Sequence, residues 1–357
     1  MIKSAKWKDL ESFLSKIVHD AIVPGAVAAV YNEGGEVFSW TGGMRETEPQ
    51  KLPVRYDTMF DLASLTKVTG VTMGAARLME AGKLDYSAKI EDFFPDPGDF
   101  AKTTVGQLLT HTGGFIAEAR LSNFIKSPDE TVQFILKGPR EYEPGTKTVY
   151  SCFGFIILGE ILSKTYGAPL NKTLAELVFN PLGMGETCFN PLKYFRKREA
   201  GFASTEYDTE TGLMLSGTVH DENARFQNGV SGNAGIFSTA KDLGRWMRML
   251  ISGGKVSDGK RFLTGETVAS FHTDFTKGMD EDRGIGFKLY PRPASSSMDM
   301  TAFGHTGFTG TSMMVDPIRK AGILLLTNRV HPSREEKRLL EARAEFNEIA
   351  FRCFDKL

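Results

Sequence analysis

The sequence predicts a mixed α/β (α+β) protein: an antiparallel sheet flanked by terminal helices, with a mostly helical insertion. Two β-like runs near the start, 26–31 and 36–41, surround a turn of Asn and Gly residues at 32–35. Two similar runs near the end, 310–315 and 321–327, flank a second turn. Paired runs around a short turn are typical of β-hairpins. We therefore expect both ends of the chain to contribute strands to one sheet.

The terminal helices are expected from the spacing of their apolar residues. Apolar positions three and four residues apart share one helix face, which can pack on the sheet. Ser333 and Glu336 also have the spacing of a capping box and predict the start of the last helix. The apolar positions are Leu10, Phe13, Leu14 and Ile17 in the first helix, and Leu339, Ala342, Phe346, Ile349 and Cys353 in the last.

The middle of the chain is expected to be mostly helical. Residues 184–235 are rich in Gly, Thr, Asn and Asp, which predicts long loops that would cover a functional site. We expect residues 1–62 and 236–357 to form a sheet-and-helix domain and residues 63–235 to form the insertion, with the active site at their seam. The predicted helices of the insertion are 65–81, 105–110, 130–136, 153–165 and 170–178.

The composition is that of a globular protein. Apolar residues make up 41% and charged residues 24% of the 357 residues, close to the usual values of about 45–50% and 25%. Lys and Arg number 43 and Asp and Glu 44, which gives a net charge of −1. This balance lacks the basic excess that phosphate binding requires. We expect no nucleic-acid partner and a small-molecule substrate, while the oligomeric state is not indicated.

Three cysteines, Cys152, Cys188 and Cys353, are an odd number and predict no disulfide framework, which fits a reducing compartment. Polar residues interrupt every apolar run in residues 1–26, so we expect neither a secretory segment nor a membrane span. These observations together predict a cytoplasmic protein. No H-E-x-x-H or C-x-x-C motif occurs in the sequence, so no metal and no cofactor are expected.

Ser64 and Lys67 are candidates for nucleophilic chemistry. They stand three residues apart at the start of a predicted helix, so they share one face. A serine hydroxyl needs a base, and a buried lysine of lowered pKa can supply it. An N-cap serine with a solvated lysine has the same spacing. The spacing recurs at Ser238/Lys241, Ser252/Lys255 and Ser257/Lys260, and Ser238, which also precedes a predicted helix, is a rival on local grounds.

Two further motifs support Ser64. Tyr150-Ser151-Cys152 presents a phenol and a hydroxyl where a loop enters a predicted helix. The alternative is that Tyr150 is an ordinary tyrosine of the hydrophobic core. His305-Thr306-Gly307 opens the C-terminal hairpin, where glycine lets a substrate backbone lie close to a strand edge. The alternative for this second motif is an ordinary glycine-rich turn.

In this order along the chain, the three motifs resemble the serine β-lactamase and penicillin-binding-protein superfamily. In particular they resemble the branch that holds class C β-lactamases, D-alanyl-D-alanine carboxypeptidases and family VIII esterases. The segments 108–114 (Leu-Leu-Thr-His-Thr-Gly-Gly), 154–160 and 235–239 are similar to that branch as well. The resemblance extends from about residue 24 to residue 328 and implies a β-lactamase/transpeptidase-like fold.

The resemblance implies an acyl-enzyme mechanism. Ser64 would be the nucleophile, and Lys67 and Tyr150 would share the roles of general base and general acid. The backbone N–H groups of Ser64 and Phe308 would form the oxyanion hole, in which one donor is typically worth about 2.7–4 kcal/mol of transition-state stabilisation. Ser238 would then be an ordinary residue before a helix that Thr239 caps.

The resemblance also assigns the substrate-binding positions. Thr306 would help to seat a substrate carboxylate, beside Gly307. His305 stands where many relatives carry lysine, and because histidine titrates near pH 7 we expect its attraction for a carboxylate to depend on pH. Cys152 occupies the position where the family usually has Asn. A thiol is a much weaker donor than an amide, so we expect weaker recognition of amides and β-lactams.

We therefore expect a metal-free serine hydrolase that transfers an acyl group to Ser64 and then to water. The substrate classes left open are a β-lactam, a D-amino-acid peptide and a short ester. A family VIII-type carboxylesterase with little β-lactam activity is the alternative that Cys152 favours. A non-catalytic binding protein on the same scaffold is a further alternative, because a fold does not determine a function.

Overall fold

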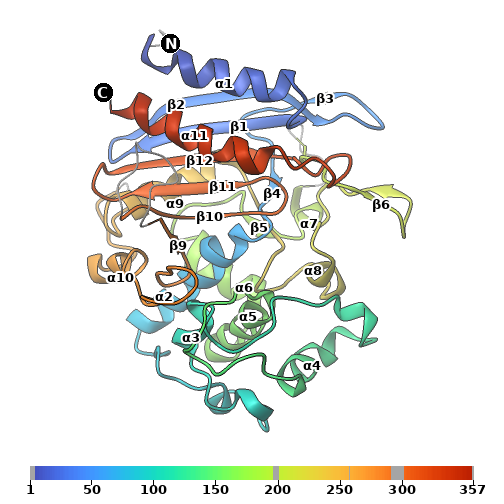
Figure 1. The fold of residues 1–357 in the computed structure, drawn as a ribbon, viewed down its shortest axis with the longest axis vertical. Helices are drawn as coiled ribbons and strands as arrows, with labels where there is room; N and C mark the ends of the chain where they lie inside the picture. The colour runs from blue at the N-terminus through green and yellow to red at the C-terminus, as the bar shows by residue number, and fades with distance from the viewer. Residues whose placement is uncertain (1–4, 196–200, 257, 291–300, 356–357) are drawn as a thin grey trace.

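The computed structural model describes residues 5–195, 201–256, 258–290 and 301–355. Its largest sheet has seven strands in the order β3-β2-β1-β12-β11-β10-β9, and all neighbours are antiparallel (Figure 1). The two ends of the chain meet where β1 pairs with β12, as predicted. The strands are β1 (Gly25–Asn32), β2 (Gly35–Glu46), β3 (Leu52–Pro53), β9 (Lys288–Leu289), β10 (Phe303–Thr306), β11 (Ser312–Asp316) and β12 (Ala321–Thr327).

The turn between β1 and β2 forms where the sequence predicts it. The side-chain oxygen of Asn32 accepts hydrogen bonds from the N–H groups of Gly34 and Gly35, at 2.9 and 3.1 Å. Gly35 has a φ of 137°, which residues with a Cβ rarely adopt. Both predicted hairpins are confirmed.

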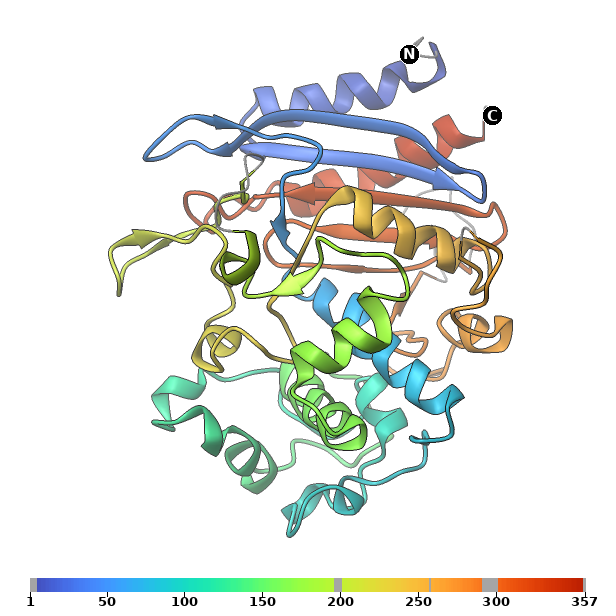
Figure 2. The same ribbon diagram turned by 180° about the vertical axis from the view of Figure 1, so that it is seen from behind.

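Alternate side chains of β1 pack against different helical layers, as the two-residue period of a strand requires. One set packs with α1 (Lys8–His19) and α11 (Leu339–Phe354), and the other packs with α9 (Ala240–Ile251). Figure 2 shows α9 crossing the face of the sheet opposite to α11. The first set is Ala26, Ala28 and Val30, and the second is Val27, Ala29 and Tyr31.

Most other helices form a helical body, which lies below the sheet in Figure 1. Its longest helix, α5, begins after Ser151, whose hydroxyl accepts a hydrogen bond from the Gly154 N–H, and ends at Gly167 with a φ of 82°. No helix in the described ranges has the length and apolar character needed to cross a bilayer. The helices are α2 (Met73–Glu80), α3 (Val105–Leu109), α4 (Thr131–Lys137), α5 (Cys152–Tyr166) and α6 (Leu170–Leu174), with π-helical segments η2 (Lys67–Thr72) and η7 (Ala175–Phe179).

The remaining elements are short. A three-stranded sheet, in the order β4-β8-β5, lies between the helical body and the seven-stranded sheet, and β6 and β7 form a hairpin that projects to the side (Figure 1). The described part of the region 184–235 is mostly loop, as predicted. The elements are β4 (Phe60–Asp61), β5 (Cys188–Phe189), β6 (Tyr207–Asp208), β7 (Leu213–Met214), β8 (Ile236–Ser238), α7 (Leu192–Phe195), α8 (Glu222–Phe226), α10 (Gly265–Ser270) and the 3-10 turns η1 (Ala5–Trp7), η3 (Ile90–Asp92), η4 (Gly98–Phe100), η5 (Leu121–Asn123) and η6 (Pro128–Glu130).

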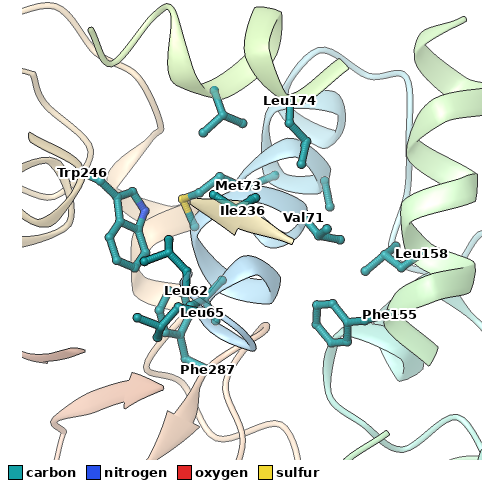
Figure 3. Packing of buried hydrophobic residues seen from close by; sticks show 14 of the residues in the cluster. Leu62, Leu65, Val71, Met73, Phe155, Leu158, Leu174, Ile236, Trp246 and Phe287 are labelled. Carbon is teal, nitrogen blue, oxygen red and sulfur yellow. The ribbon is translucent and has the colours of Figure 1, made fainter. Parts of the chain in front are cut away.

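The helix that follows Ser64 runs through the main hydrophobic core. Leu65 and Val71 are fully buried. Figure 3 shows Leu65 beside Leu62 and Val71 on the side that faces Leu158 of α5. Burying one such side chain completely contributes about 1.5–3 kcal/mol. This packing fixes the start of the helix, and with it Ser64, relative to both the sheet and the helical body.

One predicted element boundary is wrong. The last helix begins at Leu339, and no side chain caps it, so Ser333 and Glu336 do not form a capping box. The Glu336 carboxylate instead accepts hydrogen bonds from the Arg338 main-chain N–H at 2.8 Å and from its Nε at 3.0 Å. The predicted apolar face is confirmed, since Leu339, Phe346, Ile349 and Cys353 are buried and Ala342 packs beside them.

We predict that Gly232→Ala destabilises the protein. A Cβ at this position would lie 1.9 Å from the Phe155 carbonyl oxygen and 3.1 Å from the Gly159 nitrogen, both in the backbone of α5. Overpacking of this kind typically costs about 1–3 kcal/mol, occasionally more. The free energy of unfolding in urea would measure the loss. Gly185→Ala is the matched control, since a Cβ there has no atom within 4 Å, and equal stability of the two variants would contradict the prediction.

Candidate active site

Ser64 lies in a strained turn between β4 and the following helix. Ala63 has a φ of 46°, a left-handed conformation that is uncommon for a residue with a Cβ. Its N–H donates to the Asp61 carboxylate at 2.9 Å, which holds the turn. Ser64 is half-buried and lines a cavity. The turn therefore directs the hydroxyl of Ser64 away from the core that anchors the next residues.

The side-chain nitrogen of Lys67 lies at the centre of the site. Lys67 is fully buried at the start of the π-helical segment η2. Its Nζ donates to the Ser64 Oγ at 3.1 Å and to the Asn233 carbonyl oxygen at 2.9 Å. It also lies 3.7 Å from the Cys152 Sγ. Single π-helical turns are frequent at functional sites, and this one brings Lys67 directly behind the serine.

The protonation states around Lys67 follow from burial and charge. Burial by itself lowers the pKa of Lys67. At high pH, however, Cys152 and Tyr150 lose their protons before Lys67 does, and the attraction of their negative charges places the pKa of Lys67 above its ordinary value. Burial raises the pKa of the Tyr150 phenol and of the Cys152 thiol. Near neutral pH, Lys67 therefore carries the positive charge while Tyr150 and Cys152 are uncharged.

Tyr150 lies at the N-terminal end of α5 with its ring among four titratable side chains. The Nζ of Lys67 lies 4.9 Å and the guanidinium of Arg283 5.5 Å from the centre of its ring. The rings of His111 and His305 lie 4.6 and 5.8 Å away. Hydrogen bonding with Lys67 and Ser64 lowers the pKa of the phenol, although burial has the larger effect.

His305 on β10 is neutral, which corrects one expectation from the sequence. Its Nδ1 donates to the Thr306 carbonyl oxygen at 2.9 Å, so Nε2 is the unprotonated acceptor. Burial, followed by the nearby charges of Arg283 and Lys67, holds the pKa of His305 well below 6.5. His305 is therefore not expected to change charge near pH 7.

The cavity in front of Ser64 has a volume of about 680 Å³ and gathers most of the predicted site residues. Lys67 and Cys152 lie behind its wall, in contact with each other. Thr306 and Phe308 are exposed at this cavity, and the Phe308 side chain is 51% accessible. The lining includes Ser64, Tyr150, His305, Thr306, Gly307 and Phe308.

Positive charge predominates around the cavity. Six cationic side chains line it but only two acidic ones. Arg329 and Arg343 bind main-chain carbonyl oxygens, those of Phe308 at 2.6 Å and Gly307 at 2.9 Å, and within the described ranges neither is paired with a carboxylate. Burial lowers the pKa of Arg343 to about 10, so it is charged at neutral pH. The cationic residues are Arg283, Lys288, Arg329, Arg334, Lys337 and Arg343, and the acidic ones are Glu281 and Glu335.

Ser238, the alternative candidate for the nucleophile, is excluded from that role by its position. Ser238 is fully buried, and its hydroxyl shares a hydrogen bond of 2.7 Å with Thr187. Thr239 caps α9 by accepting a hydrogen bond from the Asp242 N–H at 3.3 Å, as the sequence predicts. Ser238 has neither the exposure nor the lysine contact of Ser64.

Some residues of the site have no signature in the sequence. Asn233 binds Lys67 through its main-chain carbonyl oxygen, which every residue type possesses. Arg283, whose Nε donates to Glu281 at 2.8 Å, comes from a loop without a motif. His111 binds the N–H of Ser151 at 3.0 Å. Its segment, 108–114, resembles the family, but nothing in that motif predicts this contact.

A half-exposed serine beside a buried lysine and a tyrosine, in a cavity of this size, is the arrangement of a serine hydrolase. The comparison with protein families agrees, since the model described as Beta-lactamase matches residues 10–348. The chain therefore belongs to the beta-lactamase family. None of its three cysteines, all within the described ranges, forms a disulfide bond.

The chain is similar to proteins with several different names. It is 30% identical over 328 residues to a putative D-alanyl-D-alanine carboxypeptidase of Escherichia coli (strain K12), covering 83% of this chain and 74% of that protein. It is 32% identical over 352 residues to an N-acetylmuramyl-L-alanine amidase of Bacillus subtilis (strain 168), covering 86% and 78%. A solved beta-lactamase/D-alanine carboxypeptidase from Pseudomonas syringae has the same fold, with a TM-score of 0.77, 19% identity and coverage of 99% of each chain.

We predict that His305 makes folding stability depend on pH. Its pKa is well below 6.5 in the folded chain and near 6.5 in the unfolded chain. The unfolded state therefore binds more protons below pH 6.5, and stability is lost as the pH falls, by up to about 1.4 kcal/mol per pH unit for one group. Urea unfolding at several pH values would show a flatter dependence for His305→Asn than for the wild type. Replacing the exposed His19 by Asn is the control, and identical slopes for His305→Asn and wild type would contradict the assignment.

Proposed function

We propose that the protein hydrolyses peptides of the D-alanyl-D-alanine type through an acyl-enzyme on Ser64. The observation that carries the proposal is the fully buried Lys67 ammonium, 3.1 Å from the Ser64 Oγ, beside a cavity of about 680 Å³. Burying a lysine ammonium destabilises the folded state, so a lysine without a function would be unfavourable at this position. The names of the D-alanyl-D-alanine carboxypeptidase relatives support this substrate class.

Acylation begins when the Ser64 Oγ attacks the substrate carbonyl carbon. The proton of the hydroxyl passes to the Lys67–Tyr150 pair once that pair has lost one proton. The resulting oxyanion accepts hydrogen bonds from the backbone N–H groups of Ser64 and Phe308. As the carbonyl re-forms, the electron pair of the broken bond goes to the leaving nitrogen, which takes a proton from Tyr150. A water molecule then attacks the ester and releases Ser64.

The charge around the cavity supports a substrate with a free carboxylate. Arg329 and Arg343 are charged but bind only main-chain oxygens among the described residues. Thr306 is exposed beside them and offers a hydroxyl. The C-terminal carboxylate of a peptide lies one residue from the scissile bond, so these groups would hold it while Ser64 reacts. His305 lines the same cavity and is neutral, so it adds no positive charge to this region.

Ester hydrolysis is the second candidate, and Cys152 favours it. The thiol is 6% exposed, lies 3.7 Å from Lys67 and is uncharged because burial raises its pKa. An amide side chain at this position would donate to the carbonyl of an amide substrate, whereas a thiol is a weak donor. Esters have a better leaving group and depend less on that donor.

We predict that the wild-type protein releases D-alanine from N-acetyl-L-lysyl-D-alanyl-D-alanine and that Ser64→Ala does not. The chemical reason is that the variant retains the cavity but has no hydroxyl to form the ester. An enzyme-coupled D-alanine assay would measure the rate, with Ser238→Ala as the matched control for serine replacement. Release of D-alanine by Ser64→Ala at the wild-type rate would contradict the assignment of Ser64 as the nucleophile. If the wild type hydrolyses only short esters, ester hydrolysis is favoured instead.

We also predict that Cys152→Asn increases the rate of covalent reaction with benzylpenicillin. The new amide can donate to the acyl side chain of the antibiotic, and one hydrogen bond is worth about 0.5–1.5 kcal/mol, or about 2- to 13-fold in rate. Intact-mass measurements over time would give the rate constant. Cys188→Asn is the control, since this half-buried cysteine does not line the cavity. An unchanged rate in Cys152→Asn would mean that the thiol does not limit the reaction.

A further inference from the structure

Tyr150 stands on a loop without regular secondary structure, residues 138–151, between α4 and α5. Its phenol nevertheless has to keep one position beside Ser64 and Lys67. The loop is held by the segment 111–117, which follows α3. Main-chain hydrogen bonds join the N–H of Glu141 to the oxygen of Gly114 (2.9 Å), that of Gly145 to Thr112 (2.8 Å) and that of Cys152 to Ala117 (2.8 Å).

One residue of this segment, His111, binds the chain on both sides of Tyr150. Its carbonyl oxygen accepts a hydrogen bond from the Val149 N–H at 2.9 Å. Its Nδ1 accepts another from the Ser151 N–H at 3.0 Å. Between these two bonds, its ring lies 4.6 Å from the Tyr150 ring, centre to centre. A single buried residue thus contacts the residue before Tyr150 through its main chain, and the residue after it and the aromatic ring through its side chain.

The Nδ1 of His111 remains a hydrogen-bond acceptor near neutral pH. Because Nδ1 accepts from Ser151, the proton of the neutral ring is on Nε2, which has no polar partner among the described residues. Burial, followed by the charges of Arg283 and Lys67, holds the pKa of His111 well below 6.5. The ring therefore stays neutral at pH 7 and does not exchange protons with Tyr150. Its contribution to the reaction is geometric.

We infer that His111 is a positioning residue for Tyr150, acting through the hydrogen bond from the Ser151 N–H to its Nδ1. The inference rests on the proposed function, because it concerns the activation of Ser64. Without that acceptor, the loop is free to shift at the residue that follows the phenol. A displacement of about 1 Å in a catalytic group can cost about 100-fold in rate. The inference gives the histidine of the segment 108–114 a specific role.

The test compares substitutions that keep or remove the acceptor. His111→Asn keeps it, since the Asn Oδ1 can occupy the place of Nδ1, and Asn tolerates the φ of 57° at this position. His111→Ala and His111→Leu remove it. A fluorophosphonate probe that phosphonylates activated serines reports how readily Ser64 reacts, whatever the natural substrate. Saturation kinetics separate probe binding from the reaction step, and melting temperatures are measured in parallel.

We expect His111→Ala and His111→Leu to react about 10- to 100-fold more slowly, with unchanged probe binding, and His111→Asn to react near the wild-type rate. Tyr142→Phe is the matched control. It removes a hydrogen bond of 3.1 Å to the His111 carbonyl oxygen without touching Nδ1, so it loosens the same residue and should keep the wild-type rate. If His111→Ala does not fold, His111→Leu and His111→Asn provide the comparison.

Wild-type rates in the folded variants without the acceptor would overturn the inference, as would equally slow reaction of His111→Asn and His111→Leu. A loss of rate in Tyr142→Phe as large as in His111→Ala would overturn it too, because general loosening would then explain both. If the wild-type protein itself fails to react at Ser64, the proposed function fails first. That outcome is distinct, since it appears before any variant is compared.

Discussion

Burial of the Lys67 ammonium is the constraint on which the rest of the site depends. Removing an unpaired charge from water costs several kcal/mol unless polar groups replace the solvent, and among the described residues no carboxylate pairs with this one. The replacements are a serine hydroxyl, the Asn233 carbonyl oxygen, a thiol and the faces of two aromatic rings. They come from the turn before η2, from α5 with the loop that precedes it, and from the loop before β8, so the charge can be buried only when these three parts of the chain meet.

This constraint explains why the site lies where the seven-stranded sheet and the helical body meet. The helix after Ser64 is packed into the shared core, while the turn before it holds Ala63 in a left-handed conformation. Strain of this kind persists only where the surrounding structure over-determines it. The positive charges around the cavity, including those of Arg329 and Arg343, favour the binding of an anionic group in the space beside His305.

Much of this arrangement is predictable from the sequence, because it depends on residue types at fixed spacings. The hairpins follow from alternating apolar residues around Asn and Gly, and Ser64, Lys67 and Tyr150 stand in recognisable motifs. The rest depends on contacts that residue types do not encode. The Asn233 carbonyl oxygen could belong to any residue, and the low pKa of His305 results from burial that only the tertiary structure creates. The Ser333–Glu336 spacing fitted a cap, but Arg338 binds the carboxylate instead.

We propose that Ser64 becomes acylated and that Lys67 and its neighbours activate it. The most direct measurement is the mass of the protein after brief reaction with a p-nitrophenyl ester, quenched in acid and digested to locate the acyl group. We expect one acyl group on the peptide that holds Ser64 in the wild type and none on the corresponding peptide of Ser64→Ala. An acyl group on Cys152, the other nucleophile in contact with Lys67, or unchanged ester hydrolysis by Ser64→Ala, would contradict it.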